Sequence, residues 1–205
     1  THCISSAASD VYKRQAWVKP QQARVQTMDV KPMLQANNIS FSYDSKQVLN
    51  KLNLNINAGE MVSLVGRNGV GKTTLSNIIT GFLHQSSGDL VLNGHSINEA
   101  SIKERADHIG YVLQDPNMMI SKNTVSEEVA LGLTLRAVAP DEIERRVAET
   151  FKVCGLFEFR HWPISALSFG QKKRVTIAAI LVLNPELLIL DEPTAGQDWQ
   201  HYTEM

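Results

Sequence analysis

A glycine-rich loop, preceded by an apolar run and followed by a helical segment, is the feature that most constrains this chain. The loop occupies residues 66–74 and fits the phosphate-binding pattern G-x-x-x-x-G-K-[ST] at every fixed position. Its three glycines allow the backbone to form a tight nest whose successive N–H groups approach a triphosphate. We expect Lys72 to reach the β- and γ-phosphates and the Thr73 hydroxyl to ligate Mg²⁺. The loop therefore predicts a site for a nucleoside triphosphate.

The segments on both sides of the loop agree with this prediction. Residues 61–65 form an apolar run that suits a buried parallel strand. Residues 72–82 are expected to form a helix whose positive N-terminal end faces the phosphates. The residues predicted to contact the nucleotide are Gly66, Asn68, Gly69, Gly71, Lys72, Thr73 and Thr74.

A second apolar run, residues 187–190, delivers two adjacent carboxylates at its carboxyl end. Open parallel sheets bind ligands at such strand ends. We expect Asp191 to hold Mg²⁺ through its water shell, and Glu192 to orient and deprotonate the attacking water. A solvated Asp-Glu pair is the alternative for these residues taken alone. The phosphate loop upstream favours the catalytic interpretation.

Composition limits the classes of function. The chain has 205 residues, 43% of them hydrophobic and 20% charged, which suits a globular domain with a core. Its net charge of −1 gives no basic footprint, so we expect no nucleic-acid partner. Cys3 and Cys154 match no metal spacing and favour a reducing compartment. The longest apolar run, residues 175–183, is far short of the roughly 20 residues that span a bilayer. Any membrane role is therefore expected to come through a partner.

The organisation of the chain is expected to be uneven. Residues 1–15 are small, polar and aperiodic, resemble translated adaptor sequence, and are treated as extraneous. Residues 16–32 carry two prolines and several glutamines and are predicted to be a linker. Residues 33–205 are predicted to form one domain with a helical insert at about residues 116–184.

Several secondary-structure elements are predicted from local patterns. Leu52, Leu54 and Ile56 alternate with asparagine, which is typical of a half-exposed antiparallel strand, and Asn93-Gly94 is a hairpin signal. A short strand is expected at residues 109–113. Helices are expected over residues 125–135, from Pro140 to Gly155, and from Ser168 to Asn184.

The segment Leu167-Ser168-Phe169-Gly170-Gln171 carries a family resemblance. It resembles the Leu-Ser-Gly-Gly-Gln signature of ATP-binding-cassette (ABC) nucleotide-binding domains, with Phe169 in place of the first glycine. The resemblance covers about residues 33–205. It implies an α/β fold of the P-loop NTPase class: a RecA-like mixed β-sheet core with an antiparallel β subdomain, plus an ABC-type helical subdomain. A plain serine N-cap is the alternative for Ser168.

The resemblance implies roles for further residues. Tyr43 matches the aromatic residue that stacks on adenine, a half-buried strand tyrosine being the alternative. Gln114 resembles the Q-loop glutamine that touches Mg²⁺ and the attacking water, and Asp198 matches the D-loop aspartate. Ser168, Gly170 and Gln171 would bind the γ-phosphate held by the opposite domain of a head-to-tail dimer. The resemblance implies that the cofactors are ATP and Mg²⁺. It also implies that the catalytic residues are Glu192, Lys72 and Gln114, and that the residues at the metal are Thr73, Gln114 and Asp191.

The family's switch histidine has no counterpart in residues 1–205. It is expected roughly thirty residues beyond Glu192, whereas His201 follows Glu192 too closely. We therefore expect the chain to be a cassette truncated before that region. Alone it should bind ATP weakly, hydrolyse it barely, and aggregate.

The amino-acid sequence around these motifs suggests the subfamily. Residues 41–43, 114–116, 127–132 and 194–198 resemble the ATPases of energy-coupling-factor importers. The most similar are second halves of tandem ATPases for hydroxymethylpyrimidine or thiamine uptake. The resemblance implies a second ABC ATPase domain and integral membrane subunits as partners, at the cytoplasmic face of the cell membrane. Importers of cobalt, nickel or other vitamins remain alternatives, as does a soluble non-transport ABC ATPase. A coiled-coil repair or chromosome ATPase is excluded because only 94 residues (167 minus 73) separate Thr73 from Leu167.

Overall fold

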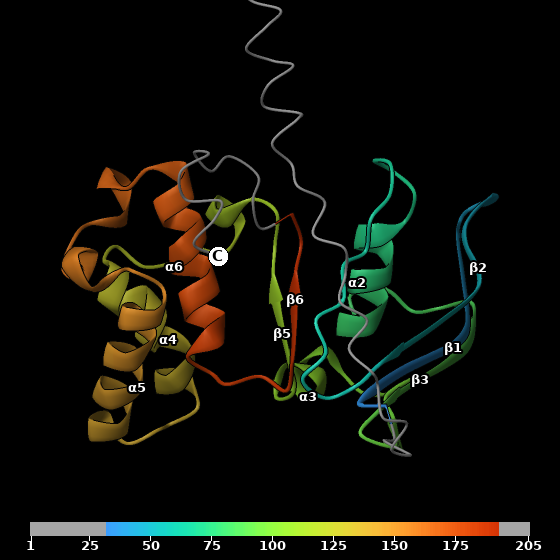
Figure 1. The fold of residues 1–205 in the computed structure, drawn as a ribbon, viewed down its shortest axis with the longest axis horizontal. Coiled ribbons are helices and arrows are strands. Elements are labelled where there is room, and N and C mark those ends of the chain that lie inside the picture. Colours follow the sequence, from blue (N-terminus) through green and yellow to red (C-terminus); the bar gives the residue numbers. More distant parts are fainter. Residues whose placement is uncertain (1–31, 193–205) are drawn as a thin grey trace, which may run out of the picture. The chain divides into compact units, whose positions relative to one another are not determined.

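The computed structural model describes residues 32–192, and the structure below is that of this part of the chain. Within it, no helix combines the length and apolar character needed to cross a membrane. The elements, in chain order, are β1 (Leu34–Tyr43), β2 (Lys46–Ile56), α2 (Lys72–Thr80), β3 (Ser87–Leu92), β4 (His95–Ser96), α3 (Ile102–Ala106), β5 (Ile109–Val112), η1 (Pro116–Met118), α4 (Val125–Leu135), α5 (Pro140–Val153), η2 (Phe157–Phe159), η3 (Ile164–Ala166), α6 (Phe169–Leu181) and β6 (Leu187–Leu190) (Figure 1).

An antiparallel sheet with the strand order β2-β1-β3-β4 forms the N-terminal part of this fold. β1 pairs with β2 from Leu34↔Ile56 to Tyr43↔Lys46, and with β3 on its other side. The asparagines of β2 are exposed, and Leu52, Leu54 and Ile56 are half-buried, as their alternation predicts. The hairpin between β3 and β4 turns at Asn93 and Gly94, both with positive φ, which confirms the turn predicted from that dipeptide.

Strands β5 and β6 form a separate parallel pair. The register runs from Ile109↔Leu187 to Val112↔Leu190, so both strands end at the same edge. The residues that follow each strand therefore leave the sheet side by side. This register brings the segment that contains Gln114 next to Asp191 and Glu192.

The segment before the phosphate loop differs from its prediction. Residues 61–65 are not a buried strand: they form no regular element, and Met61 and Val65 are 96% and 94% exposed. A buried strand requires a neighbour that pairs its backbone groups. Within residues 32–192 no strand pairs with this segment, and its apolar composition alone does not supply one.

Two hydrophobic clusters form the core of the described residues. The first joins β1 and β3 to α2, with Leu34, Ile39 and Ile78 fully buried. The second joins α4, α5 and α6, with Val129 and Val175 fully buried. Figure 1 shows these three helices gathered together on the side of the parallel pair where β5 lies. Helix α4 spans the predicted residues, whereas α6 ends at Leu181, before the predicted Asn184.

Candidate nucleotide site

The phosphate loop turns tightly into α2. Gly69 and Gly71 have φ angles of 80° and 111°, a region that side chains with a Cβ rarely adopt. A Cβ on Gly71 would also lie 3.0 Å from side-chain atoms of Val48 and Leu49 in β2. Helix α2 begins directly at Lys72, so its N-terminal N–H groups face the loop. The tight loop directly before the start of α2 is the geometry that the predicted anion site requires, and the anion site itself stays a prediction.

The Lys72 side chain folds over this loop. Its Nζ donates to the carbonyl oxygens of Gly66 and Arg67, at 2.9 and 3.2 Å. The ammonium group therefore lies against the loop in which we expect the phosphates to bind. Thr74, the last residue of the motif, is buried at the start of α2.

Thr73 and Asp191 meet although 118 residues separate them in sequence. The Thr73 hydroxyl donates to Asp191 Oδ2 at 3.0 Å. The Tyr111 hydroxyl, from β5, lies 3.4 Å from the same oxygen. Burial, and next the charge of Asp191, raise the pKa of Tyr111 to about 12. Tyr111 was not predicted to be near the site, because a strand tyrosine carries no motif of its own.

Gln114 and Glu192 also meet at the end of the parallel pair. The amide Nε2 of Gln114 donates to Glu192 Oε2 at 2.6 Å. Glu192 has a φ of 47°, a left-handed conformation that costs a residue with a Cβ roughly 1–2 kcal/mol. The turn places its exposed carboxylate beside the amide of Gln114. The predicted candidates for water activation are thus in direct contact.

Lys173 supports the same region from α6 and was missed by the sequence reasoning. Its Nζ donates to the carbonyl oxygens of Leu113, Gln114 and Asp191, at 2.7, 2.8 and 3.3 Å. Burial lowers the pKa of Lys173, and the charges of Asp191, Asp115 and Glu192 oppose that shift. In sequence, Lys173 is one of several polar residues at the start of a helix, and nothing local distinguishes it from a surface lysine.

The predicted signature residues form a helix N-terminus. Ser168 caps α6 with a capping box: its Oγ accepts from Gln171 N, and Gln171 Oε1 accepts from Ser168 N. Phe169, the first residue of the helix, is 41% exposed. Among the described residues, no hydrogen bond joins 168–171 to the phosphate loop. The capping box thus uses the polar groups of Ser168 and Gln171, with Gly170 between them, within α6 itself.

The two remaining candidates differ in how far the structure describes them. Tyr43 ends β1, is about half exposed, and packs edge-on against Phe41 with ring centroids 4.8 Å apart. Its ring is accessible to a stacking partner. Asp198 lies outside the described residues.

The described residues suit a magnesium ion bound mainly through the nucleotide. Thr73 and Asp191 supply adjacent hydroxyl and carboxylate oxygens, the hard donors that Mg²⁺ prefers. Within residues 32–192, no cluster of three or more His, Cys, Asp or Glu side chains forms a complete metal site. Two protein ligands, completed by phosphate oxygens and water, are typical of Mg²⁺ in nucleotide sites.

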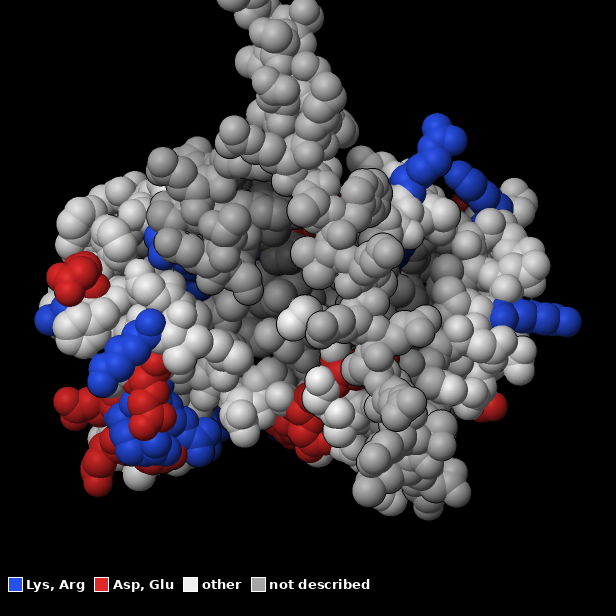
Figure 2. Space-filling model, viewed as in Figure 1, with Lys and Arg blue, Asp and Glu red and all other residues white. Residues whose placement is uncertain are grey.

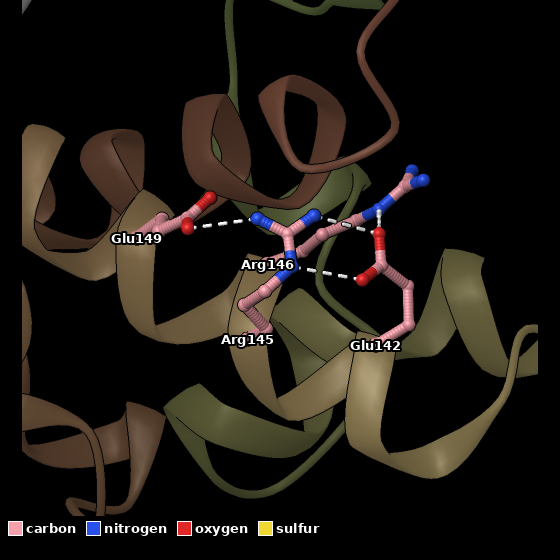
Figure 3. Close-up of polar contacts among 4 residues, drawn as sticks. All are labelled: Glu142, Arg145, Arg146 and Glu149. Atoms are coloured by element: carbon pink, nitrogen blue, oxygen red, sulfur yellow. Dashed lines mark hydrogen bonds and ion pairs between the residues drawn. The ribbon is translucent and has the colours of Figure 1, made fainter.

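A network of ion pairs lies on α5. On the face drawn in Figure 2, acidic and basic side chains intermingle over α5. There Arg145 bridges Glu142 and Glu149, and Arg146 also contacts Glu142 (Figure 3). Hydrogen bonds from Arg145, then Arg146, lower the pKa of Glu142 to about 2. The network neutralises itself and stabilises the helix surface, so it is not a binding site for an ion.

The chain is similar in sequence to known proteins. A family model described as "ABC transporter" matches residues 49–195. The chain is 61% identical over 192 residues to a protein of Lactiplantibacillus plantarum named as an ABC transporter ATP-binding protein, covering 93% of this chain and 34% of that protein. A Clostridium perfringens protein with the same description is 52% identical over 199 residues, covering 97% and 35%. The chain thus spans about a third of the length of these curated relatives.

Solved structures show the same fold. CbiO1 of Clostridium perfringens, part of the ABC transporter complex CbiONQ, superposes with a TM-score of 0.79 at 37% identity, covering 85% of this chain and 70% of CbiO1. A dimeric ATP-binding cassette in a post-hydrolysis state, bound to ADP and Pi, superposes with a TM-score of 0.73 at 31% identity, covering 84% and 79%. The P-loop NTPase fold class, with its antiparallel sheet and helical region, is therefore confirmed.

Proposed function

Because the chain belongs to the ABC transporter family, we propose that it binds Mg-ATP at residues 66–74 and hydrolyses it to drive transport. The contact between Thr73 and Asp191 carries this proposal. Two residues far apart in sequence place a hydroxyl and a carboxylate oxygen 3.0 Å apart, and the hydroxyl belongs to the phosphate loop itself. Packing alone does not require such a pair, whereas a phosphate-bound Mg²⁺ does.

The described residues divide the work of hydrolysis. Lys72 binds the β- and γ-phosphates and stabilises the charge that develops on them. Glu192 takes a proton from the attacking water, and Gln114 orients that water through the amide that now contacts Glu192. Mg²⁺, when bound by Thr73 and Asp191, neutralises charge on the phosphate oxygens.

Replacement of Lys72 by alanine tests the assignment. In the intact protein, Lys72→Ala removes the cation that faces the phosphates, and kcat should fall by about 10²-fold or more. Lys103→Ala, which changes an exposed lysine on α3, is the matched control and should leave turnover unchanged. ATPase activity is measured by phosphate release for both variants. Wild-type turnover in Lys72→Ala would contradict the proposed site.

The signature segment supports a dimeric arrangement. The N-terminus of α6 is capped by Ser168, and within the described residues it makes no hydrogen bond to its own phosphate loop, so in the proposed arrangement it serves the nucleotide of a second ABC domain. The dimeric cassette bound to ADP and Pi, to which this chain is similar, is a precedent for two domains around nucleotide. The partner is a second copy of this domain or a related cassette.

An apolar pocket supports docking to an integral membrane subunit. It has a volume of about 300 Å³ and lies next to the segment that follows Gln114. Its walls include Phe82, Ile102, Leu113 and Met119. A short amphipathic helix of a membrane subunit fits such a groove through its apolar face. Because Leu113 leads directly to Gln114, movement of the docked helix would be transmitted to the candidate catalytic residues. Docking there would place the protein at the cytoplasmic face of the membrane.

The substrate proposal depends on the sequence resemblance. Residues 127–132 and the motifs around them resemble energy-coupling-factor ATPases for hydroxymethylpyrimidine or thiamine, and CbiO1 is a structural relative from the CbiONQ complex. We favour import of such a vitamin precursor over cobalt, nickel or another vitamin, and over a soluble ATPase. Uptake of labelled hydroxymethylpyrimidine, thiamine and cobalt, in cells with and without the intact gene, distinguishes these outcomes. Loss of none of the three upon deletion would contradict the transport assignment for these substrates.

A further inference from the structure

The amino group of Lys173 is completely buried, with 0% of the residue exposed, where three segments of the chain meet. Its three hydrogen-bond partners, the main-chain oxygens of Leu113, Gln114 and Asp191, can only accept. The nitrogen therefore donates three hydrogens, which only the protonated amine carries. Among the described residues, no carboxylate lies within ion-pair distance of it. A charged group is thus buried to hold the main chain.

These carbonyl groups lie where the β5–β6 ladder stops. The last ladder bond joins Asp191 N to Val112 O, at 3.0 Å. Beyond it, the segments that follow β5 and β6 are joined by the Gln114–Glu192 side-chain contact and by Lys173. Where the strand pairing ends and the candidate catalytic side chains begin, Lys173 therefore holds the two main-chain segments together through its hydrogen bonds. It also ties both strand ends to α6, the helix that Ser168 caps.

We propose that Lys173 is a positioning residue for ATP hydrolysis, which fixes the main chain at Gln114 and Asp191 so that Gln114 and Glu192 remain in register with the phosphate loop. The inference rests on the proposed function, because it concerns the same reaction. Lys173 makes no hydrogen bond to the phosphate loop within residues 32–192. It should therefore affect the rate of turnover and not the affinity for nucleotide.

Lys173→Met in the intact protein is the first test, because methionine is unbranched and of similar length but donates no hydrogen bond. A displacement of about 1 Å at catalytic groups costs on the order of 10²-fold in rate, so we expect kcat to fall by at least 10-fold. KM and the Kd of a fluorescent ATP analogue should change by less than about 3-fold, the kcat-only pattern of an interaction that acts on the transition state. Lys152→Met, an exposed lysine on α5, is the control and should match the unmodified protein.

A double-mutant cycle with Gln114→Ala separates positioning from general destabilisation. If Lys173 acts through Gln114, Lys173→Met should lower kcat much less in the Gln114→Ala background than alone. Equal losses in both backgrounds, an unchanged kcat, or a rise in Kd that matches the fall in kcat would each overturn the proposal. If Lys173→Met loses analogue binding because it does not fold, the cycle is run with Lys173→Gln, which keeps amide donors.

Hydrogen exchange distinguishes this proposal from the proposed function. The amides of residues 113–117 should exchange faster in Lys173→Met than in the unmodified protein, whether or not ATP is hydrolysed. Unchanged exchange there would overturn the positioning role. Failure of the proposed function has a different signature, namely no turnover in the unmodified protein.

Discussion

Arg105 stabilises the end of α2 that lies away from the phosphates. The side chain is 2% exposed and its guanidinium donates to four carbonyl oxygens. Nη1 contacts Ile78 O and Ile79 O at 2.8 and 3.1 Å, Nε contacts Ala100 O at 3.0 Å, and Nη2 contacts Asn98 O at 3.1 Å. Two of these carbonyls belong to the last turn of α2, where a cation also compensates the helix dipole. Burial of the charge lowers the pKa of Arg105.

Arg105→Met replaces this anchor with an apolar side chain of similar length. Hydrogen bonds to charged groups contribute about 1.5–3 kcal/mol each to the free energy of unfolding. The sum for four such bonds is an upper bound on the loss in Arg105→Met. Two terms offset the loss: the guanidinium is no longer desolvated, and Ile78 O keeps its bond from Gly81 N. We therefore expect a net loss of about 2–4 kcal/mol in the free energy of unfolding, within the range for one side of a buried polar network.

The thermal midpoint of the intact protein measures this loss. For a domain of this size, 1 kcal/mol shifts Tm by about 2–4 °C, so a fall of roughly 5–15 °C is expected. Arg160→Met is the control, because within the described residues the Arg160 guanidinium makes only local contacts with Phe157: one exposed hydrogen bond, to Phe157 O at 2.7 Å, and a position over the Phe157 ring. It should lower Tm by less than about 2 °C. The stabilisation by saturating Mg-ATP should be retained in Arg105→Met, since the phosphate end of α2 is unchanged. An equal Tm for Arg105→Met and Arg160→Met would refute the reasoning.

Three further predictions follow from contacts described above. Glu192→Gln should retain bound ATP and form a stable dimer, because hydrolysis stops while both nucleotide-binding faces stay engaged; light scattering that shows only monomer in saturating Mg-ATP would count against this. Ile102→Glu, in the apolar pocket, should reduce transport while leaving basal ATPase intact, whereas Leu135→Glu, an exposed change outside the pocket, should affect neither; equal loss of both activities in Ile102→Glu would instead indicate a folding defect. Glu142→Gln should have a lower Tm than the unmodified protein, and the difference should reach its largest value above about pH 4.5 and disappear as pH falls towards 2. The reason is that Arg145 holds the folded-state pKa of Glu142 near 2, below its ordinary value of 4.5. A Tm difference that is independent of pH would contradict this.

The sequence predicted the elements whose signals are local. Helix α4 was predicted from its helical composition, and in the structure it begins after Thr124, where Thr124 and Glu127 form a capping box. The meeting of Thr73 with Asp191 was predictable for another reason. Each belongs to a motif with a defined place in the sheet, so the two motifs fix the contact without a model of the whole chain.

Contacts that depend on distant neighbours were not predictable in the same way. Residues 61–65 were expected to be buried because they are apolar, but burial requires a paired strand that composition does not specify. Lys173 and Arg105 were missed for the opposite reason. Charged residues on helices are usually solvated, and only the carbonyl groups that converge on these two make their burial favourable.

The division of the described core into two hydrophobic clusters has a consequence for how substitutions combine. Leu34 belongs to one cluster and Val129 to the other. Destabilising changes at two such positions share no packing neighbours, so their effects on the free energy of unfolding should simply add. Non-additive pairs are expected where the two clusters are joined. One such place is the contact of β5, which carries Ile109 of the first cluster, with α6, which carries Val175 of the second. The two elements are close there, since an added Cβ on Gly110 of β5 would lie 2.5 Å from Ile180 of α6. A map of pairwise couplings across the chain would therefore show two independent blocks linked by a few positions at the β5–α6 contact.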